Sequence, residues 1–164
     1  MTKFGITPSQ TVGPFFAIGL PWDRGPYAVP EGSEDAVWLR GRVVDGEGQP
    51  VPDAMLETWQ STGEGRGFAR CGTSDDGSYA ILFRKPAPDG TGQAPHLAMS
   101  VFARGLLDRV VTRVYFADDD HSGDPVLALV PDGRRDTLIA RPSADGYTFD
   151  IRLQGEGETV FLDV

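Results

Sequence analysis

The sequence predicts an all-β fold, a β-sandwich with an extended N-terminal arm. Several short stretches alternate apolar and polar residues with the period of two that is typical of strands, and turn residues separate them. Glycine (21) and proline (13) are abundant, which suits many short strands joined by turns. A chain of 164 residues is long enough for one sizeable core. We therefore expect a single domain, with the arm at 1–36 and the sandwich at 37–164.

The sequence of the N-terminal arm shows no helix or strand pattern. Thr7–Phe16 (TPSQTVGPFF) contains two prolines and a glycine, which exclude a regular element from its middle. It is either a cover for an edge of the core or a fixed loop that approaches a ligand. Leu20–Gly32 is rich in Gly and Pro and carries Trp22 and Tyr27. Because this segment cannot bury those rings by itself, we expect it to pack on a partner subunit.

Strand periodicity then recurs along the rest of the chain. The turn at Asp45–Gly48 follows the first strand, and Ser61–Gly67 and Lys85–Gln93 read as loops. Pro125–Val130 is compatible with one helical turn. The expected strands are Val37–Asp45, Ala54–Gln60, Tyr79–Arg84, His96–Ala103, Val110–Phe116, Thr137–Ala140 and Tyr147–Gln154, with Val160–Val164 ending the chain.

Charge and cysteine content restrict the partners and the compartment. The formal net charge of −9 argues against nucleic acid or an anionic membrane as a partner. The single cysteine, Cys71, permits no internal disulfide and fits a reducing cytoplasm. We see no apolar signal core in Met1–Gln10 and no apolar run of about 20 residues, so neither export nor a membrane span is expected.

The common catalytic motifs are missing from the sequence. There is no GxGxxG or GxxxxGK[ST] loop, no CxxC and no GxSxG. The two histidines, His96 and His121, are 25 positions apart, and Ala98 follows His96 on the same strand face. The acidic stretch Asp118–His121 offers metal-ligating groups, but consecutive aspartates do not converge, which favours a solvated loop. The residues alone therefore suggest a binding or scaffold module.

Arg104 is the one residue here that suggests recognition of an anion. It follows the expected strand His96–Ala103 and precedes Gly105. An arginine at the end of a core strand is suited to hold an anionic ligand. The alternative interpretation is a solvated arginine at a strand end, and the residues by themselves favour that alternative.

Several segments closely resemble one family, the intradiol ring-cleavage dioxygenases, and within it the alpha subunits of the two-subunit enzymes. The resemblance runs from Thr7 to Val164. The segments are TPSQTVGPFF at Thr7–Phe16, LETWQ at Leu56–Gln60, APHLAMSVFARG at Ala94–Gly105, TRVYF at Thr112–Phe116, RRDTLIA at Arg134–Ala140 and FDIRLQGEGETVFLDV at Phe149–Val164.

The resemblance implies a fold, a partner and a reaction. Family members have a β-sandwich core, and the alpha subunit pairs with a homologous beta subunit in a higher αβ oligomer. The beta subunit holds a non-haem Fe(III) through two tyrosines and two histidines. The enzyme inserts both atoms of O₂ into 3,4-dihydroxybenzoate and gives 3-carboxy-cis,cis-muconate. The alpha subunit lines the substrate pocket, holds no metal and is inactive alone.

The family's substrate-binding residues on the alpha side fall on Thr11, Gly13, Pro14 and Arg104. Phe15 stands where related chains have tyrosine, so a hydroxyl contact there is lost. The set is physically reasonable, because Gly13 lets the backbone approach, Pro14 offers a rigid wall and Arg104 supplies positive potential for a benzoate-type anion. We expect no catalytic residue in this chain.

The same resemblance explains the single strand histidine. His96 matches the first histidine of the beta subunit's ligand pair, and Ala98 replaces the second. The loop segments Ser61–Gly67 and Lys85–Gln93, where ligand tyrosines would fall, contain none, and the loop after Trp59 is shorter than is usual in the family. Two alternatives remain: a stand-alone binding module on the same sandwich, and a divergent intradiol dioxygenase that assembles its own metal site for another catechol.

Overall fold

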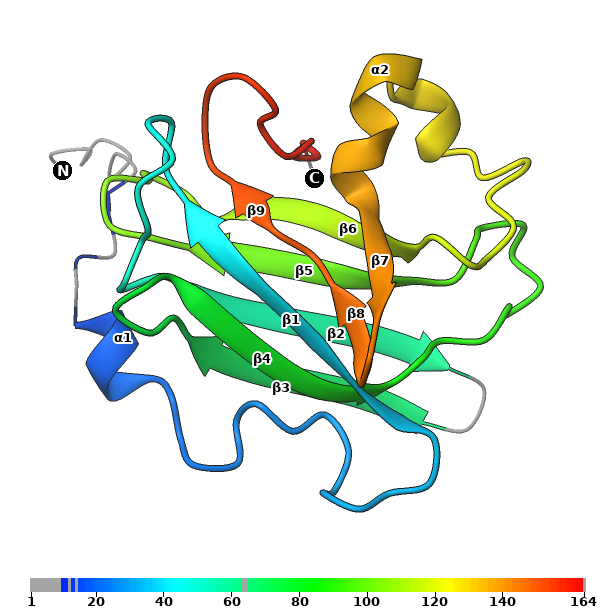
Figure 1. The fold of residues 1–164 in the computed structure, drawn as a ribbon, viewed down its shortest axis with the longest axis horizontal. Helices are drawn as coiled ribbons and strands as arrows, with labels where there is room; N and C mark the ends of the chain where they lie inside the picture. Colours follow the sequence, from blue (N-terminus) through cyan, green and yellow to red (C-terminus); the bar gives the residue numbers. More distant parts are fainter. Residues whose placement is uncertain (1–9, 12, 14, 63–64, 164) are drawn as a thin grey trace, which may run out of the picture.

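The computed structural model describes residues 10–163 except 12, 14, 63 and 64. Its strands are hydrogen-bonded into one curled sheet with few helices (Figure 1). The strands are β1 Ala36–Val44, β2 Met55–Thr62, β3 Gly65–Gly72, β4 Ser78–Arg84, β5 His96–Phe102, β6 Val110–Phe116, β7 Ile139–Ser143, β8 Gly146–Thr148 and β9 Ile151–Arg152. The helical segments are α1 Phe16–Gly19, η1 Leu127–Leu129, α2 Asp132–Arg135 and η2 Asp136–Leu138.

The order of the strands brings distant parts of the chain together. The sheet runs β3-β2-β5-β6-β7-β8-β1-β4, and β9 pairs with β1 outside this path. Neighbours are antiparallel, except that β6 and β7 are parallel and β1 is parallel to β8 and β9. The sheet curls so that β1 and β4 lie across from β2 and β5 (Figure 1).

The core fills the space between the two halves of this sheet. One buried cluster joins β1 and β4 residues such as Leu39 and Phe83 to Leu97, Met99 and Val101 of β5. The alternation predicted for β5 is confirmed, since these three side chains point into the core. The opposite face of β5, with His96 and Ala98, points away from the core and is only partly covered. The candidate site therefore lies outside the core.

Three sequence predictions of secondary structure differ from the structure. The expected strand Thr137–Ala140 is correct only in its second half, because η2 runs to Leu138 and β7 begins at Ile139. Ser61–Gly67 was expected to be a loop, but β2 continues to Thr62 and β3 begins at Gly65. Gly67 must lack a side chain, because a Cβ there would lie 2.9 Å from Cγ of Gln60. The expected strand Tyr147–Gln154 is split into β8 and β9. At that break the carbonyl oxygen of Phe149 would lie 1.8 Å from a Cβ on Gly41 of β1.

The segment Leu20–Gly32 packs in part on its own chain, and its packing on a partner subunit stays a prediction. Trp22 stacks on Phe68 of β3 with ring centroids 6.2 Å apart, and the guanidinium of Arg70 lies over its ring. Tyr27 forms a bridge with Leu82 of β4 and meets Trp38 edge-on. No helix in the described part of the chain is long and apolar enough to cross a membrane.

Candidate functional site

Polar side chains gather at both ends of β5. Figure 1 shows the β5–β6 turn and α1 at one end of the sheet and the loop between β4 and β5 at the other. Arg104 follows β5 at the first end, and His96 begins β5 at the second. The eight residue-to-residue steps from His96 to Arg104 correspond to roughly 26 Å of extended chain, so these are two separate sites.

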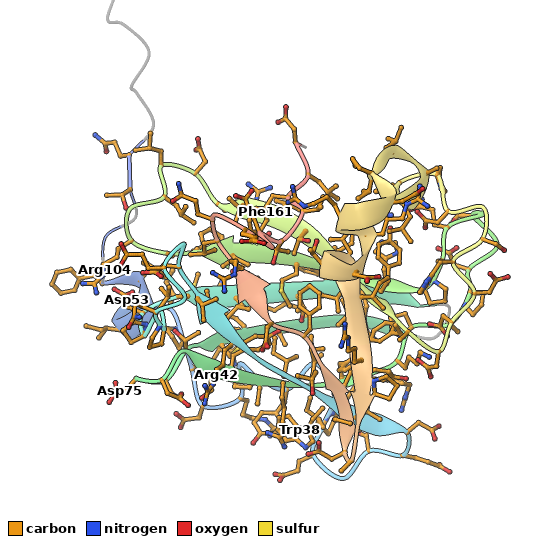
Figure 2. The ribbon with its side chains drawn as sticks, turned by 45° about the horizontal axis from the view of Figure 1, so that its top comes forward. Trp38, Arg42, Asp53, Asp75, Arg104 and Phe161 are labelled. Carbon is orange, nitrogen blue, oxygen red and sulfur yellow. The ribbon has the colours of Figure 1, made fainter. Side chains whose placement is uncertain are left out.

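Arg104 is held in an ion pair at the edge of the molecule. Its Nε lies 3.0 Å from Oδ2 of Asp53, which comes from the loop between β1 and β2 (Figure 2). The Arg104 side chain is 62% exposed, whereas that of Asp53 is only 17% exposed. The other carboxylate oxygen of Asp53 is buried and has no hydrogen-bond partner among the described residues. The pair fixes the inner end of the guanidinium and leaves its outer part accessible.

The structure places part of the predicted substrate-binding set together. Oγ1 of Thr11 accepts a hydrogen bond of 3.1 Å from the N–H of Gly105, next to Arg104. Gly13 has a φ of +69°, and a Cβ there would meet no atom within 4 Å. Pro14 lies outside the described residues. The structure thus brings Thr11 to the Arg104 turn, leaves Gly13 open, and adds Asp53, which sequence reasoning missed.

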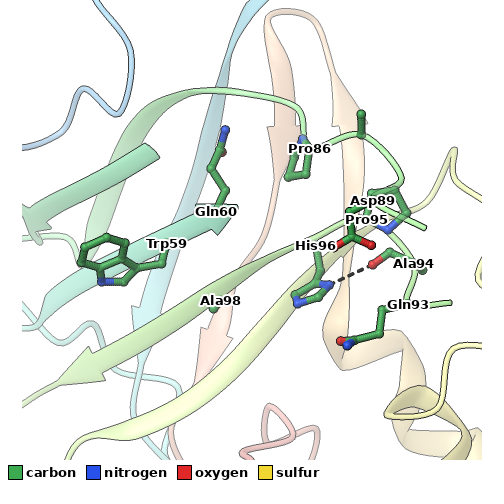
Figure 3. Close-up of a pocket in the computed structure, with 10 residues that line it drawn as sticks. Trp59, Gln60, Pro86, Asp89, Gln93, Ala94, Pro95, His96 and Ala98 are labelled. Carbon is green, nitrogen blue, oxygen red and sulfur yellow. Dashed lines mark hydrogen bonds between the residues drawn. The ribbon is translucent and has the colours of Figure 1, made fainter. Parts of the chain in front are cut away.

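The other end of β5 lines a pocket of about 500 Å³ (Figure 3). Trp59 and Gln60 of β2 form one side, His96 and Ala98 of β5 form the floor, and the β4–β5 loop, residues 85–95, forms the rest. Trp59 and Ala98 are directly paired across the strands, and His96 shares their face of the sheet. A pocket of this size is in the range of small-molecule sites.

His96 is neutral and presents a hydrogen-bond acceptor. Its Nδ1 lies 2.8 Å from the carbonyl oxygen of Ala94, which can only accept, so Nδ1 carries the proton (Figure 3). Burial lowers the pKa of His96, and the nearby Arg113 guanidinium also lowers it. Within the described residues Nε2 makes no hydrogen bond, so its lone pair is available to a donor in the pocket.

Asp124 anchors the strand that carries His96. Its Oδ2 accepts a hydrogen bond of 2.8 Å from the N–H of Ala94. Its Oδ1 accepts from the N–H groups of Val126 and Leu127 and from the hydroxyl of Tyr115. Sequence reasoning missed Asp124, although an aspartate directly before Pro125 and a helical turn is a recognisable capping pattern.

The acidic stretch Asp118–His121 was expected to be a solvated loop, but two of its aspartates form ion pairs. Lys85 pairs with both Asp118 and Asp119 at 2.9 and 2.8 Å, and Tyr147 donates to Asp118. These contacts tie the end of β6 to the end of β4. Among the residues with described positions, no three His, Cys, Asp or Glu side chains gather as a metal site would require.

Comparisons with known proteins give a consistent set of relatives. No family model matches the chain. The protocatechuate 3,4-dioxygenase alpha chain of Burkholderia cepacia is 41% identical over all of both chains. The alpha chain of Pseudomonas putida is 39% identical over 96% of each chain. The beta chain of Burkholderia cepacia is 32% identical over 76% of this chain and 67% of its own length.

Solved structures with a similar fold are also dioxygenases. The dioxygenase domain of a carbohydrate-binding fusion protein from Streptomyces sp. SirexAA-E has a TM-score of 0.60 at 22% identity, over 91% of this chain and 98% of its own. Catechol 1,2-dioxygenase from Pseudomonas arvilla C-1 has a TM-score of 0.55 at 21% identity, over 79% of this chain and 55% of its own. At these identities the likeness concerns the fold alone.

Proposed function

Since the chain belongs to the family of protocatechuate 3,4-dioxygenase alpha chains, we propose that it is the alpha subunit of a two-subunit intradiol dioxygenase. The substrate is 3,4-dihydroxybenzoate, which the complex cleaves with O₂ to 3-carboxy-cis,cis-muconate. The observation that carries this proposal is the full-length likeness to alpha chains, accompanied by a weaker likeness to a beta chain. The facing halves of the curled sheet support the expected sandwich architecture.

The residues of this chain do not fit a non-haem iron site of its own. His96 offers one imidazole, and the neighbouring position on the same strand face carries the methyl group of Ala98. No tyrosine is among the residues that line the pocket in the described part of the chain. We therefore infer that a homologous beta subunit binds the Fe(III), and we assign no step on the metal to this chain.

The role we assign to this chain is recognition of the substrate by Thr11, Gly13, Pro14 and Arg104. The chain has a net charge of −9, so an exposed guanidinium is needed to attract a benzoate-type anion locally. The ion pair with Asp53 supports this role, because it orients Arg104 and leaves the outer part of the guanidinium exposed.

Exposed apolar side chains near these residues support a subunit contact. Phe15 comes directly after Pro14 of the predicted substrate-binding set in the sequence and is 79% exposed. Leu107, in the turn that carries Arg104, is 63% exposed. Ile18 of α1 exposes a similar fraction of its side chain. Large exposed apolar side chains of this kind are typical of surfaces that bind another protein. We infer that the beta subunit covers them.

Co-expression with a homologous beta chain tests the proposal. The purified chain alone should be colourless and inactive, and activity with the visible colour of iron-phenolate should appear only in the complex. The measurements are the absorption spectrum and O₂ consumption with 3,4-dihydroxybenzoate. Strong visible absorption from the chain alone would favour an independent metal site. Failure to associate with any beta chain would favour a stand-alone binding module.

Asp53→Asn should raise the KM for 3,4-dihydroxybenzoate about two- to tenfold with little change in kcat. Asp53 orders the Arg104 side chain, and ordering a long side chain costs roughly 0.5–1.5 kcal/mol when binding has to do it instead. Asp145→Asn is the matched control, because it breaks the exposed pair with Arg40 elsewhere on the surface. A lower KM in Asp53→Asn would contradict this expectation, because it would show that the negative charge of Asp53 repels the substrate carboxylate more than it helps to orient Arg104.

Cys71→Ser should leave turnover of the complex within about twofold, a change of less than ~0.5 kcal/mol in the barrier. Cys71 is buried on β3, and burial raises the pKa of its thiol to about 12, so it is not a nucleophile at neutral pH. A large loss of turnover at unchanged protein content would contradict this expectation.

Location in the cytoplasm remains a prediction from the single cysteine.

A further inference from the structure

The pocket around His96 is not part of the proposed substrate-recognition set. Its lining comes from the ends of β2 and β5 and from the β4–β5 loop (Figure 3). Thr11, Gly13 and Arg104 belong to the opposite end of β5, where the chain turns towards β6. This second pocket is therefore separate from the Arg104 site.

Within the described residues, the pocket presents one hydrogen-bond acceptor that has no donor, Nε2 of His96. Nε2 of His96 carries a free lone pair, as argued above. Gln60 is buried in the wall and donates from Nε2 to the carbonyl oxygen of Arg84 at 2.9 Å. Its Oε1 is buried and has no hydrogen-bond partner among the described residues, but Gln60 points to the face of β2 opposite to Trp59, so this atom is not presented to a ligand. Because polar atoms are normally paired, the free acceptor on His96 favours a ligand that brings a donor.

The rest of the wall is apolar and suits a flat ring. Trp59 packs against Phe68 with ring centroids 4.7 Å apart and remains 53% exposed where it borders the pocket. Pro86 and Pro95 add rigid apolar surface on the loop side, and Ala98 keeps the floor clear (Figure 3). Aromatic rings stack or meet edge-on with favourable energy in such surroundings.

The charge of the pocket selects against an anion. The carboxylate of Asp89 is the one charged group that lines it within the described residues. Hydrogen bonds from Thr91 lower the pKa of Asp89, so it is ionised at neutral pH. The nearby guanidinium of Arg113 does not line the pocket and is engaged by Gln93 at 2.7 Å. A carboxylated ligand would therefore meet the negative charge of Asp89, while the nearest guanidinium, that of Arg113, is already engaged by Gln93.

We propose that this pocket binds a neutral phenol, whose hydroxyl donates to Nε2 of His96 and whose ring lies between Trp59 and the loop prolines. The site is metal-free and does no chemistry. Its preference is opposite to that of Arg104, which is suited to a carboxylated aromatic. Binding here involves only this chain, and therefore the proposal does not rest on the dioxygenase activity.

Fluorine NMR titration of the full-length chain with three ring probes tests the proposal. The probes are 4-fluorophenol, a neutral donor; 4-fluoroanisole, a neutral ring without a donor; and 4-fluorobenzoate, an anion. We expect saturable broadening and shift of the 4-fluorophenol resonance. The other two probes should bind at least tenfold more weakly. Equal binding of the phenol and the anisole, or tighter binding of the benzoate, would overturn the proposal.

Three variants locate the binding site. His96→Leu should weaken 4-fluorophenol at least tenfold and leave 4-fluoroanisole nearly unchanged, because it removes the acceptor Nε2, together with the Nδ1 donor to Ala94, and keeps an apolar side chain on the floor. Ala98→Phe should abolish binding of every probe by filling the floor. Ser100→Ala is the control, since Ser100 lies two residues further along the same strand face and does not line the pocket. Thermal unfolding confirms that each variant is folded, and phenol binding that survives Ala98→Phe would place the ligand elsewhere.

Discussion

Asp124→Ala is expected to destabilise the chain by about 2–4 kcal/mol. Asp124 is only 2% exposed, and its carboxylate accepts hydrogen bonds from three backbone N–H groups and one hydroxyl. Alanine would leave these donors without partners in a buried place, where each unpaired group is costly. Urea unfolding measures the loss directly, and the midpoint of thermal unfolding should fall by about 4–16 °C.

Asp120→Ala is the matched control for this prediction. Asp120 lies four residues earlier and, within the part of the chain that the structure describes, accepts hydrogen bonds only from its near neighbour Ser122. It is exposed, so its removal should cost less than about 0.5 kcal/mol. Similar losses in the two variants would contradict the anchoring role of Asp124.

The effect of Asp124 should also depend on pH. Burial alone would raise the pKa of its carboxyl, but hydrogen bonds from Leu127, Ala94 and Val126 outweigh burial and hold the pKa below its usual value. A group with a lowered pKa in the folded state stabilises the protein above its unfolded pKa of about 4. This contribution is lost as the pH falls through the folded pKa. The stability difference between the protein and Asp124→Ala should therefore narrow below about pH 4.

The strands with clear alternation were predictable from the sequence, and β3 shows why others were not. In β5 the buried residues Leu97, Met99 and Val101 alternate with partly exposed ones, as the pattern indicates. In β3 the glycines at positions 65, 67 and 72 weaken the alternation and give the segment the composition of a loop. Gly67 is there because Gln60 approaches it closely, and this requirement comes from tertiary packing.

The candidate sites depended on contacts that no local pattern contains. Thr11 and Gly105 are 94 positions apart, and only the path of the arm along the sheet brings them together. Asp53 reads as an ordinary loop residue until β2 pairs with β5 and places it beside Arg104. His96 and Ala98 were identified on one strand face, but the pocket over them needs the β4–β5 loop, whose path the composition did not predict.

Arg104→Ala is expected to lower kcat/KM for 3,4-dihydroxybenzoate about ten- to hundredfold in the αβ complex. The substrate carries a carboxylate, and ligation of its two hydroxyls by the partner's iron would leave the opposite edge of the ring for protein recognition. A charge-assisted hydrogen bond to that edge is worth roughly 1.5–3 kcal/mol, which corresponds to this loss. Arg109→Ala, an exposed arginine in the same turn, is the control for the change in net charge.

Catechol separates recognition of the carboxylate from a structural role of Arg104. Catechol has the two hydroxyls but no carboxylate, so Arg104→Ala should affect it much less. Iron content of the complex should be unchanged, because we propose that the metal ligands lie on the other chain. If Arg104 only holds the turn together through Asp53, both substrates should lose activity equally and Asp53→Asn should reproduce the loss. A loss confined to the carboxylated substrate requires that the guanidinium meets the anion directly or through one water.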